Sequence, residues 1–323
     1  MINKIIKESC QSKTNVILVG YTGFVGKNLM NSFKFDALFN SKNISDAYNT
    51  EPDILVYAGV PGTKFLANLY PQNDLEIINN AKMNIRKINP KKLVLISTVD
   101  VYDTPVNKTE IDKPSVDQIS SYGRNRAELE DWVTANVKNY LIVRLPAIYG
   151  IGLKKNFIYD ITEEIPAYLN IAKYEELINI DKRISKYYEK ENDCFYHCKS
   201  LTRNERKILL KYLISAKFTT LFFTDSRSSF QFYNLEYLWG HINIALKNDI
   251  KILNLVVEPL SAAEVYFGIF NKTFLNDSRD KNIFNYNLKT IYADIFGGKN
   301  GYIFDRNYIL DDLKYFVLHS KKQ

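Results

Sequence analysis

The stretch Val16-Ile17-Leu18-Val19-Gly20-Tyr21-Thr22-Gly23-Phe24-Val25-Gly26 decides the fold of this chain. Its four apolar residues predict a buried strand, and three glycines at a spacing of three lead from that strand into a helix. The first glycine permits a tight bend, the second lets backbone N–H groups approach a phosphate, and the third lets the helix pack against the strand. The stretch therefore predicts a pyrophosphate site at a helix N-terminus.

The spacing of these glycines leaves a second interpretation open. GxxGxxG differs from GxGxxG, the commonest dinucleotide fingerprint, so the helix start is expected to lie differently against the cofactor. A glycine-rich turn in an α/β domain that binds no nucleotide would have the same local pattern. The residues further along the chain distinguish the two.

The composition is that of an ordinary globular protein. The chain has 323 residues, of which 46% are hydrophobic, enough for one large domain or two coupled ones. The first residues lack an apolar signal segment, and no segment approaches the roughly 18 apolar residues that span a bilayer. Three cysteines, an odd number, favour a reducing compartment over a disulfide framework. We expect a cytoplasmic protein with no membrane partner.

The charge and the metal-binding residue types point to no further ligand class. The net charge is +7, but the basic residues are scattered among acidic ones, and no basic face with stacking aromatics is apparent, so nucleic acid is not an expected partner. Cys194, His197 and Cys198 lie close together in the sequence without a second ligand pair at a recognisable spacing. Because a zinc site needs three or four converging ligands, we expect these residues to be structural and predict no metal.

Apolar runs alternate with helical patterns along the chain, which predicts the architecture. Buried strands are expected at Val16–Val19, 54–58, 93–97 and 140–144, with a weaker one at 36–39 and a later one at 252–257. Continuous apolar runs separated by helices are typical of a parallel sheet covered on both faces. The pattern predicts an α/β fold: a Rossmann-like, doubly wound parallel sheet with a smaller, mainly helical substrate domain.

The pattern changes after residue 151, which predicts the domain organisation. Helical patterns are expected at 161–184 and 204–217, a capping box at Ser261 and Glu264 opens a helix through Phe270, and a last helix is expected at 310–318. We predict a dinucleotide-binding domain at 1–150, completed by about 228–260. A substrate-binding helical cap is predicted at 151–227 and 261–323.

Four separate motifs, in order, resemble those of one enzyme family. They are the glycine turn, Ser97-Thr98-Val99-Asp100-Val101-Tyr102, Ser120-Ser121-Tyr122-Gly123-Arg124-Asn125-Arg126 and Arg144-Leu145-Pro146-Ala147-Ile148-Tyr149-Gly150. Together they resemble the extended short-chain dehydrogenase/reductases, the NAD-dependent epimerase/dehydratase group that modifies nucleotide sugars. The resemblance covers most of 14–160 and 228–270. It implies an NAD(P)-dependent oxidoreductase and, more distantly, a role in polysaccharide biosynthesis.

The resemblance implies the catalytic residues. Thr98 matches the hydroxyl that orients the substrate oxygen, Tyr122 matches the general acid/base, and Arg126 lies where the family has lysine. A phenol with a pKa of about 10 needs a nearby cation to act as a base at neutral pH, and position 126 shares a helix face with position 122. Arginine keeps that charge but cannot release a proton. The alternatives are a working tyrosine–arginine pair and a degraded site.

The expected cofactor is NAD(P)(H), with a preference for NADP(H). No acidic residue ends the strand expected at 36–39, where one would bind the ribose of NAD, and Lys42 follows instead. The predicted cofactor-binding residues are Gly20, Thr22, Gly23, Phe24, Val25, Gly26, Ser41, Lys42, Ala58, Gly59, Tyr122 and Arg126.

The substrate is expected to be a sugar, in keeping with the resemblance, and nucleotide-linked. Asp100, Asn156 and Lys155 are the predicted substrate residues, with local capping and solvation as their alternative roles. Val99 replaces the first of the paired acids found in dehydratases of the family, which disfavours dehydration. The sequence favours a keto-sugar reductase over a redox-neutral epimerase. A non-catalytic dinucleotide-binding sensor or scaffold is the alternative from another class. The oligomeric state is left open, with a homodimer as one expectation.

Overall fold

The computed structural model describes residues 14–114, 120–277 and 283–320. Within these ranges the chain divides into two compact units, each described by itself below. The first comprises the described parts of residues 1–104, 110–145 and 235–255. The second comprises those of residues 105–109, 146–234 and 256–323.

The first unit is built on a parallel sheet whose strands are the apolar runs of the sequence. Its order is β12-β5-β4-β3-β1-β2, and every neighbouring pair is parallel. The strands are β1 (Val16–Val19), β2 (Ala37–Phe39), β3 (Ile54–Tyr57), β4 (Leu93–Thr98), β5 (Tyr140–Leu145) and β12 (Ile252–Asn254). The strand expected at 252–257 is shorter than predicted, because pairing with β5 ends at Asn254.

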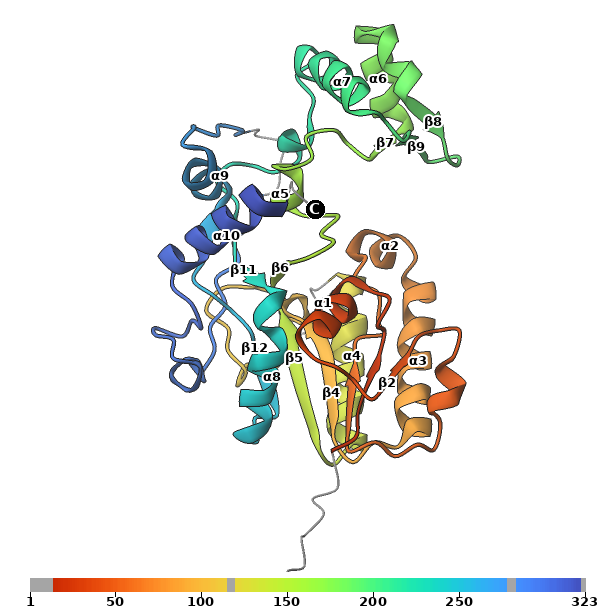
Figure 1. Ribbon diagram of the computed structural model, residues 1–323, viewed down its shortest axis with the longest axis vertical. Helices are drawn as coiled ribbons and strands as arrows, with labels where there is room; N and C mark the ends of the chain where they lie inside the picture. Colours follow the sequence, from red (N-terminus) through yellow and green to blue (C-terminus); the bar gives the residue numbers. More distant parts are fainter. Residues whose placement is uncertain (1–13, 115–119, 278–282, 321–323) are drawn as a thin grey trace, which may run out of the picture. The chain divides into compact units, whose positions relative to one another are not determined.

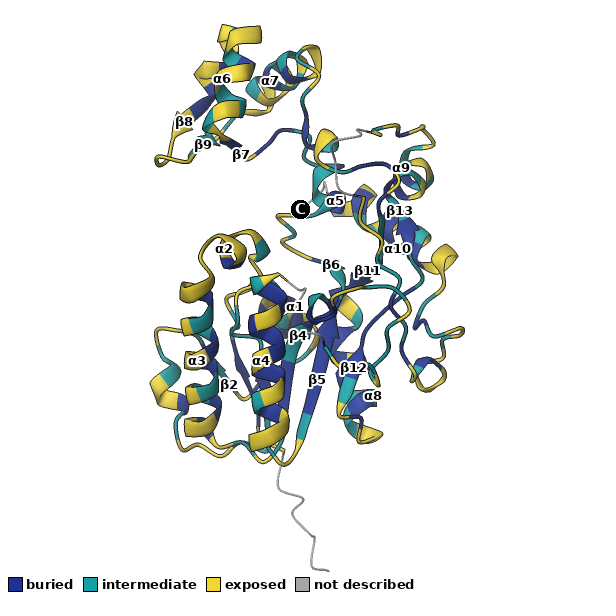
Figure 2. Ribbon diagram, turned by 180° about the vertical axis from the view of Figure 1, so that it is seen from behind, coloured by how far each residue is buried: buried dark blue, intermediate teal, exposed yellow. Residues whose placement is uncertain are grey.

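Helices cover both faces of this sheet. Figure 2 shows α3 (Pro71–Ile88) and α4 (Ser121–Asn136) in front of the strands, and Figure 1, from the opposite side, shows α1 (Phe24–Ser32) and α8 (Leu238–Lys247). Ile78, Ile85 and Leu129 on α3 and α4 share one buried core with the strands. The short helices are η1 (Ile44–Ala47), α2 (Lys64–Leu69), η2 (Val99–Val101) and η5 (Leu235–Tyr237). The predicted doubly wound sheet is confirmed.

The strand order reverses at β1, and this reversal places the candidate site. β1 pairs with β2 on one side and with β3 on the other, so the connections that leave their carboxyl ends diverge. In open α/β sheets, ligands bind at such a switch point, outside the carboxyl ends of the strands. Gly20 and Ala58 follow β1 and β3 directly and lie at this point.

The second unit holds small sheets and helices. β6 (Ala147–Tyr149) pairs with β11 (Phe232–Asn234) in parallel, and β10 (Ser229–Phe230) pairs with β13 (Leu260–Ser261) in antiparallel fashion. Its other elements are α5 (Phe157–Asp160), η4 (Thr220–Phe223), α9 (Ala262–Phe270), η6 (Ala293–Phe296) and α10 (Arg306–Ser320). The predicted capping box is confirmed: Ser261 accepts from the Glu264 N–H, and Glu264 accepts from that of Ser261.

One part of the second unit differs from the sequence prediction. The expected helix at 161–184 is instead β7 (Tyr168–Asn170), α6 (Ile171–Ile180) and η3 (Lys182–Tyr187). Pro166 cannot donate a helical hydrogen bond, and the Asn170 side chain caps α6 instead. β7 joins β9 (Phe195–Cys198) and β8 (Tyr188–Lys190) in an antiparallel sheet, and the predicted charged helix forms as α7 (Arg203–Ser215). A separate apolar cluster, including Leu177, Ile184 and Leu209, holds this segment together.

None of the helices in the described ranges combines the length and the apolar character needed to cross a bilayer.

Candidate active site

Two glycines of the turn after β1 are required by the fold. Gly20 has a φ of 93°, which L side chains rarely adopt, and a Cβ there would lie 2.3 Å from the Ala58 carbonyl oxygen. A Cβ on Gly26 would lie 2.2 Å from the Gly20 carbonyl oxygen, so α1 packs against the turn only because residue 26 has no side chain. These contacts bring the carboxyl ends of β1 and β3 and the start of α1 together.

Gly23 differs from its two neighbours in the motif. A Cβ there would meet only the Gly20 carbonyl oxygen, at 3.3 Å, and its φ of −75° is open to any residue. It is the N-cap of α1 and is exposed, yet it has no side chain to accept hydrogen bonds from the first helical turn. Those N–H groups therefore lack the acceptor that an N-cap residue ordinarily supplies. An anion such as the pyrophosphate of a dinucleotide would supply that acceptor.

The other predicted residues of the turn surround this helix start. Thr22 is exposed, and Phe24 and Val25 are half-buried at the first positions of α1. Across the switch point, Ala58 and Gly59 follow β3 and are half-buried. A Cβ on Gly59 would touch the Val19 side chain at 3.1 Å, so the two strand ends pack closely.

The loop after β2 presents no acidic side chain. Asn40 and Asn43 stabilise this loop: the Asn43 Oδ1 accepts from the Asn40 N–H at 2.8 Å, and the Asn40 Oδ1 accepts from the Lys42 N–H at 2.8 Å. Ser41 and Lys42 are both exposed. The polar groups at this strand end are thus a hydroxyl, amides and one cation, without the carboxylate that binds the ribose of NAD in many dinucleotide sites.

Tyr122 lies in the first turn of α4, and two other segments hold that turn. Ser120 caps the helix by accepting from the Gly123 N–H, and Asn68 of α2 accepts from the Tyr122 N–H at 2.9 Å. Thr98 ends β4, and its side chain lies beside that of Tyr122. Both residues are buried: Thr98 is 8% exposed and Tyr122 is 9% exposed. The structure therefore brings together the two hydroxyl groups that the sequence places 24 residues apart.

Arg126 follows Tyr122 by one helical turn and packs against its ring. The guanidinium carbon lies 3.9 Å from the centre of the Tyr122 ring, a distance typical of a cation–π contact. Its donors serve Asp74 of α3, the Pro61 carbonyl at 2.7 Å and the Tyr122 carbonyl at 3.2 Å. Arg126 and Asp74 form a buried ion pair, 4% and 5% exposed.

The surroundings of Tyr122 raise the pKa of its phenol. Burial is the largest cause, because it disfavours the charged phenolate. Arg126 and the hydrogen bond from Thr98 act in the opposite direction, while the carboxylates of Asp100 and Asp74 raise the pKa further. The cation at position 126 does not outweigh burial, so the pKa of the phenol lies above its ordinary value.

Asp100 lies beside this pair and has a partner that the sequence does not reveal. Its carboxylate accepts from Lys64 of α2 at 2.9 Å, and its backbone N–H donates to the Thr98 hydroxyl at 3.2 Å. The Asp100 side chain is 19% exposed, so one side of it faces solvent. Asp100 is therefore placed to stabilise its own loop or to contact a substrate.

Asn156 and Lys155 belong to the second unit. The Asn156 amide is occupied by local structure: it caps α5 by accepting from the Ile158 and Tyr159 N–H groups, and it donates to the Ile148 carbonyl. Lys155 is exposed. Contact of either residue with a substrate stays a prediction.

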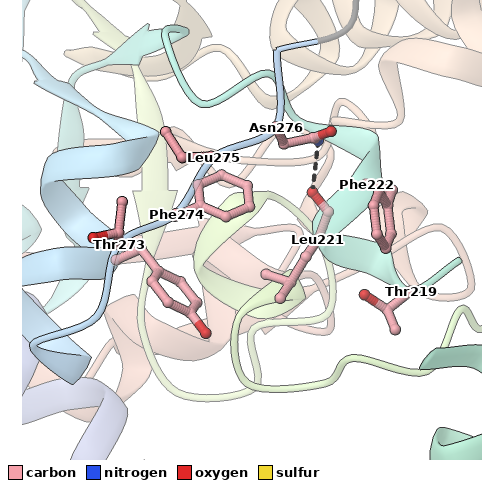
Figure 3. A pocket seen from close by; sticks show the side chains of 8 residues that line it. Thr219, Leu221, Phe222, Thr273, Phe274, Leu275 and Asn276 are labelled. Atoms are coloured by element: carbon pink, nitrogen blue, oxygen red, sulfur yellow. Dashed lines mark hydrogen bonds between the residues drawn. The ribbon is translucent and has the colours of Figure 1, made fainter. Parts of the chain in front are cut away.

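A cavity of ≈ 200 Å³ lies in the second unit (Figure 3). Its lining is largely apolar and consists of Thr219, Leu221, Phe222, Tyr266, Thr273, Phe274, Leu275 and Asn276. The Asn276 side-chain amide donates hydrogen bonds to the backbone carbonyls of Leu221 and Thr224. The cavity includes none of the predicted site residues and is smaller than the roughly 300 Å³ lower bound of typical small-molecule sites.

Sequence reasoning missed Asp74, Lys64 and Asn68. Pro71 followed by Asp74 is the ordinary signature of a helix N-terminus, which gives an acid in the first turn a sufficient reason to be there. Nothing in the sequence relates these residues to Tyr122, which lies about 50 residues further along the chain.

Solved structures share this fold over nearly the whole chain. UDP-glucose 4-epimerase from Thermotoga maritima, solved with UDP-glucose, is 13% identical; the match covers 95% of this chain and 99% of that chain, with a TM-score of 0.60. dTDP-4-dehydrorhamnose reductase from Yersinia enterocolitica is 13% identical; the match covers 94% of this chain and 99% of the reductase, with a TM-score of 0.61. The protein RMD from Pseudomonas aeruginosa, solved with NADPH, is 14% identical; the match covers 96% of this chain and 99% of RMD, with a TM-score of 0.60.

A scan against protein-family models finds no match, and a search of curated proteins finds none either. The structural likenesses confirm the Rossmann-like fold that the sequence predicts.

Proposed function

We propose that this chain is an NAD(P)-dependent oxidoreductase of the extended short-chain dehydrogenase/reductase family that reduces a keto group on a nucleotide-linked sugar. The observation that carries the proposal is the buried Thr98–Tyr122 pair, because Thr98 ends β4 at the same edge of the parallel sheet as the glycine turn that follows β1. The solved epimerase with UDP-glucose and the dTDP-4-dehydrorhamnose reductase support the substrate class. The NADPH complex of RMD supports the cofactor class.

The proposed reaction needs one hydride and one proton. A reduced nicotinamide cofactor, when bound, would supply the hydride. Tyr122 donates its phenol proton to the carbonyl oxygen, which becomes the hydroxyl of the product, and Thr98 hydrogen-bonds to the same oxygen. The phenolate that remains recovers a proton from water. Each turnover thus converts the carbonyl, a hydride and a proton into a secondary alcohol.

The raised pKa of Tyr122 supports the reductive direction. A phenol that is protonated at neutral pH is a proton donor, as reduction requires, whereas oxidation of a hydroxyl begins with a base. A redox-neutral epimerase is the second candidate, favoured by the likeness to UDP-glucose 4-epimerase. It uses the same residues but must begin by removing a proton.

The first prediction concerns Gly23→Ala. We expect stability to fall by about 1 kcal/mol, because alanine is a poorer N-cap than glycine. NADPH affinity should fall about 10- to 100-fold, since the new methyl group lies where a phosphate approaches the helix start and hydrogen bonds to charged groups contribute about 1.5–3 kcal/mol. Titration calorimetry with NADPH, beside thermal unfolding, measures both. Unchanged affinity would place the pyrophosphate elsewhere.

The second prediction separates reductase from epimerase and tests Lys42. With nucleotide-linked keto sugars we expect stoichiometric loss of NADPH absorbance, faster than with NADH. Lys42→Gln should lower the affinity for NADPH by about tenfold and leave that for NADH unchanged, because one charge-assisted contact to a phosphate is lost. Mass spectrometry of nucleotide released from the freshly purified protein adds the contrasting outcome. Tightly held stoichiometric NAD would favour the epimerase, and binding of neither cofactor would favour a scaffold.

A further inference from the structure

Asp74 is buried where a carboxylate is ordinarily exposed. It lies in the first turn of α3, a position that acidic residues favour because of the helix dipole and usually occupy on the surface. Here it is 5% exposed, and its Oδ2 accepts from Arg126 and, at 2.8 Å, from the Asn125 amide. Burying a carboxylate is costly unless it is paired. The helix dipole alone therefore does not account for its placement.

Arg126 uses its planar fork to join three segments at Tyr122. Its donors reach Asp74 on α3, the Pro61 carbonyl after β3 and the Tyr122 carbonyl on α4. Within the described part of the chain, none of its hydrogen bonds goes to the Tyr122 hydroxyl. A lysine ammonium is a point charge without a fixed fork and would not serve these three acceptors in the same geometry.

We propose that Asp74 is a positioning residue for Tyr122, which fixes the Arg126 guanidinium against the face of the phenol ring and keeps its donors occupied away from the hydroxyl group. The proposal rests on the proposed function, in which Tyr122 is the proton donor. In this arrangement Arg126 stabilises the ring and does not relay protons, and its permanent charge is balanced by Asp74.

The charges around Tyr122 follow from this arrangement. They are Arg126 on α4, Asp74 on α3, Asp100 on η2 and Lys64 of α2, which pairs with Asp100. Asp74 and Asp100 favour the protonated phenol, while Arg126 favours the phenolate more than Asp74 opposes it. Removing the Asp74 carboxylate alone therefore leaves the charge of Arg126 unbalanced, and the pKa of Tyr122 falls. Removing both members of the pair leaves burial and Asp100 to act without a cation.

The test is a titration of Tyr122 in protein without substrate or cofactor. Protein labelled with ¹³C at tyrosine Cζ has a signal for each phenol, and the one missing in Tyr122→Phe identifies Tyr122. In Asp74→Asn we expect the acid dissociation constant of Tyr122 to increase at least about tenfold, because a like charge is removed and Arg126 is released. In the double variant Asp74→Asn/Arg126→Gln we expect it to decrease below the wild-type value.

Glu130→Gln is the matched control. Glu130 lies on α4, as Arg126 does, and forms a buried ion pair with Arg144, but it is not among the groups that shift the pKa of Tyr122. This variant should lose stability comparably and leave the Tyr122 titration unchanged. An Asp74→Asn variant that behaves like Glu130→Gln overturns the proposal. If Asp74→Asn does not fold, the double variant decides, because it leaves neither member of the ion pair charged. An acid dissociation constant of Tyr122 that is unchanged or increased in the double variant overturns the proposal as well.

Kinetics separate this proposal from the proposed function. In Asp74→Asn the fall in kcat for keto-sugar reduction at high pH should begin at lower pH, because the proton donor is lost as pH rises through its pKa, while KM stays near the wild-type value. If the wild-type protein reduces no nucleotide-linked sugar, the proposed function fails. The titration still decides whether Asp74 acts on Tyr122.

Discussion

Replacing Tyr122 by phenylalanine is expected to lower kcat for the proposed reduction by about 10²–10⁴-fold, the usual contribution of a positioned general acid. The ring, its contact with Arg126 and its place beside Thr98 are kept, so the loss is confined to the transferred proton. NADPH affinity should stay close to the wild-type value, because the proposed pyrophosphate site is at the start of α1 and not at the Tyr122 hydroxyl. Steady-state kinetics and calorimetry on the same preparation measure both quantities.

Tyr102→Phe is the matched control for this prediction. Tyr102 is also a buried tyrosine of the first unit, but its hydroxyl accepts from Arg144 at 2.6 Å and hydrogen-bonds to Asn254. Its loss should cost about 1–3 kcal/mol of stability by leaving polar groups unsatisfied, with little change in kcat of the folded enzyme. If Tyr122→Phe keeps turnover within a few-fold of the wild type, Tyr122 is not the acid.

Replacing Gly20 by alanine is expected to lower the free energy of unfolding by about 3 kcal/mol or more, the sum of backbone strain and overpacking. The added Cβ would lie 2.3 Å from the Ala58 carbonyl oxygen, and the φ of 93° adds a penalty that no side-chain movement removes. Relief requires the ends of β1 and β3 to separate, which opens the switch point. Denaturant unfolding followed by circular dichroism measures the loss.

Gly240→Ala provides the comparison. Gly240 lies on α8 of the same unit, is exposed, and has open space around a Cβ. Alanine there should raise stability by about 0.5–1 kcal/mol, because glycine is the poorer helix former. If both variants unfold alike, the close approach of Gly20 to Ala58 has no energetic importance and the turn is more adaptable than its geometry indicates.

The parallel sheet was predictable because its signals are local. A continuous apolar run bounded by turn residues specifies a strand buried on both faces, and Val16–Val19 forms β1 with the bounds predicted. The Ser261–Glu264 capping box starts its helix for the same reason, since each partner lies three residues from the other. The expected helix at 161–184 was wrong where apolar periodicity was followed across Pro166, which cannot donate to a helix.

The sequence by itself determined the strands of the parallel sheet and the glycine turn, because each depends on residues close to one another in the chain. Only the tertiary structure decided what surrounds Tyr122. Arg126 is four residues away in the chain, but its charge is balanced by Asp74 on another helix, and burial raises the pKa of the phenol despite that cation. Desolvation and ion pairing depend on which distant segments pack together, and no local pattern encodes that packing.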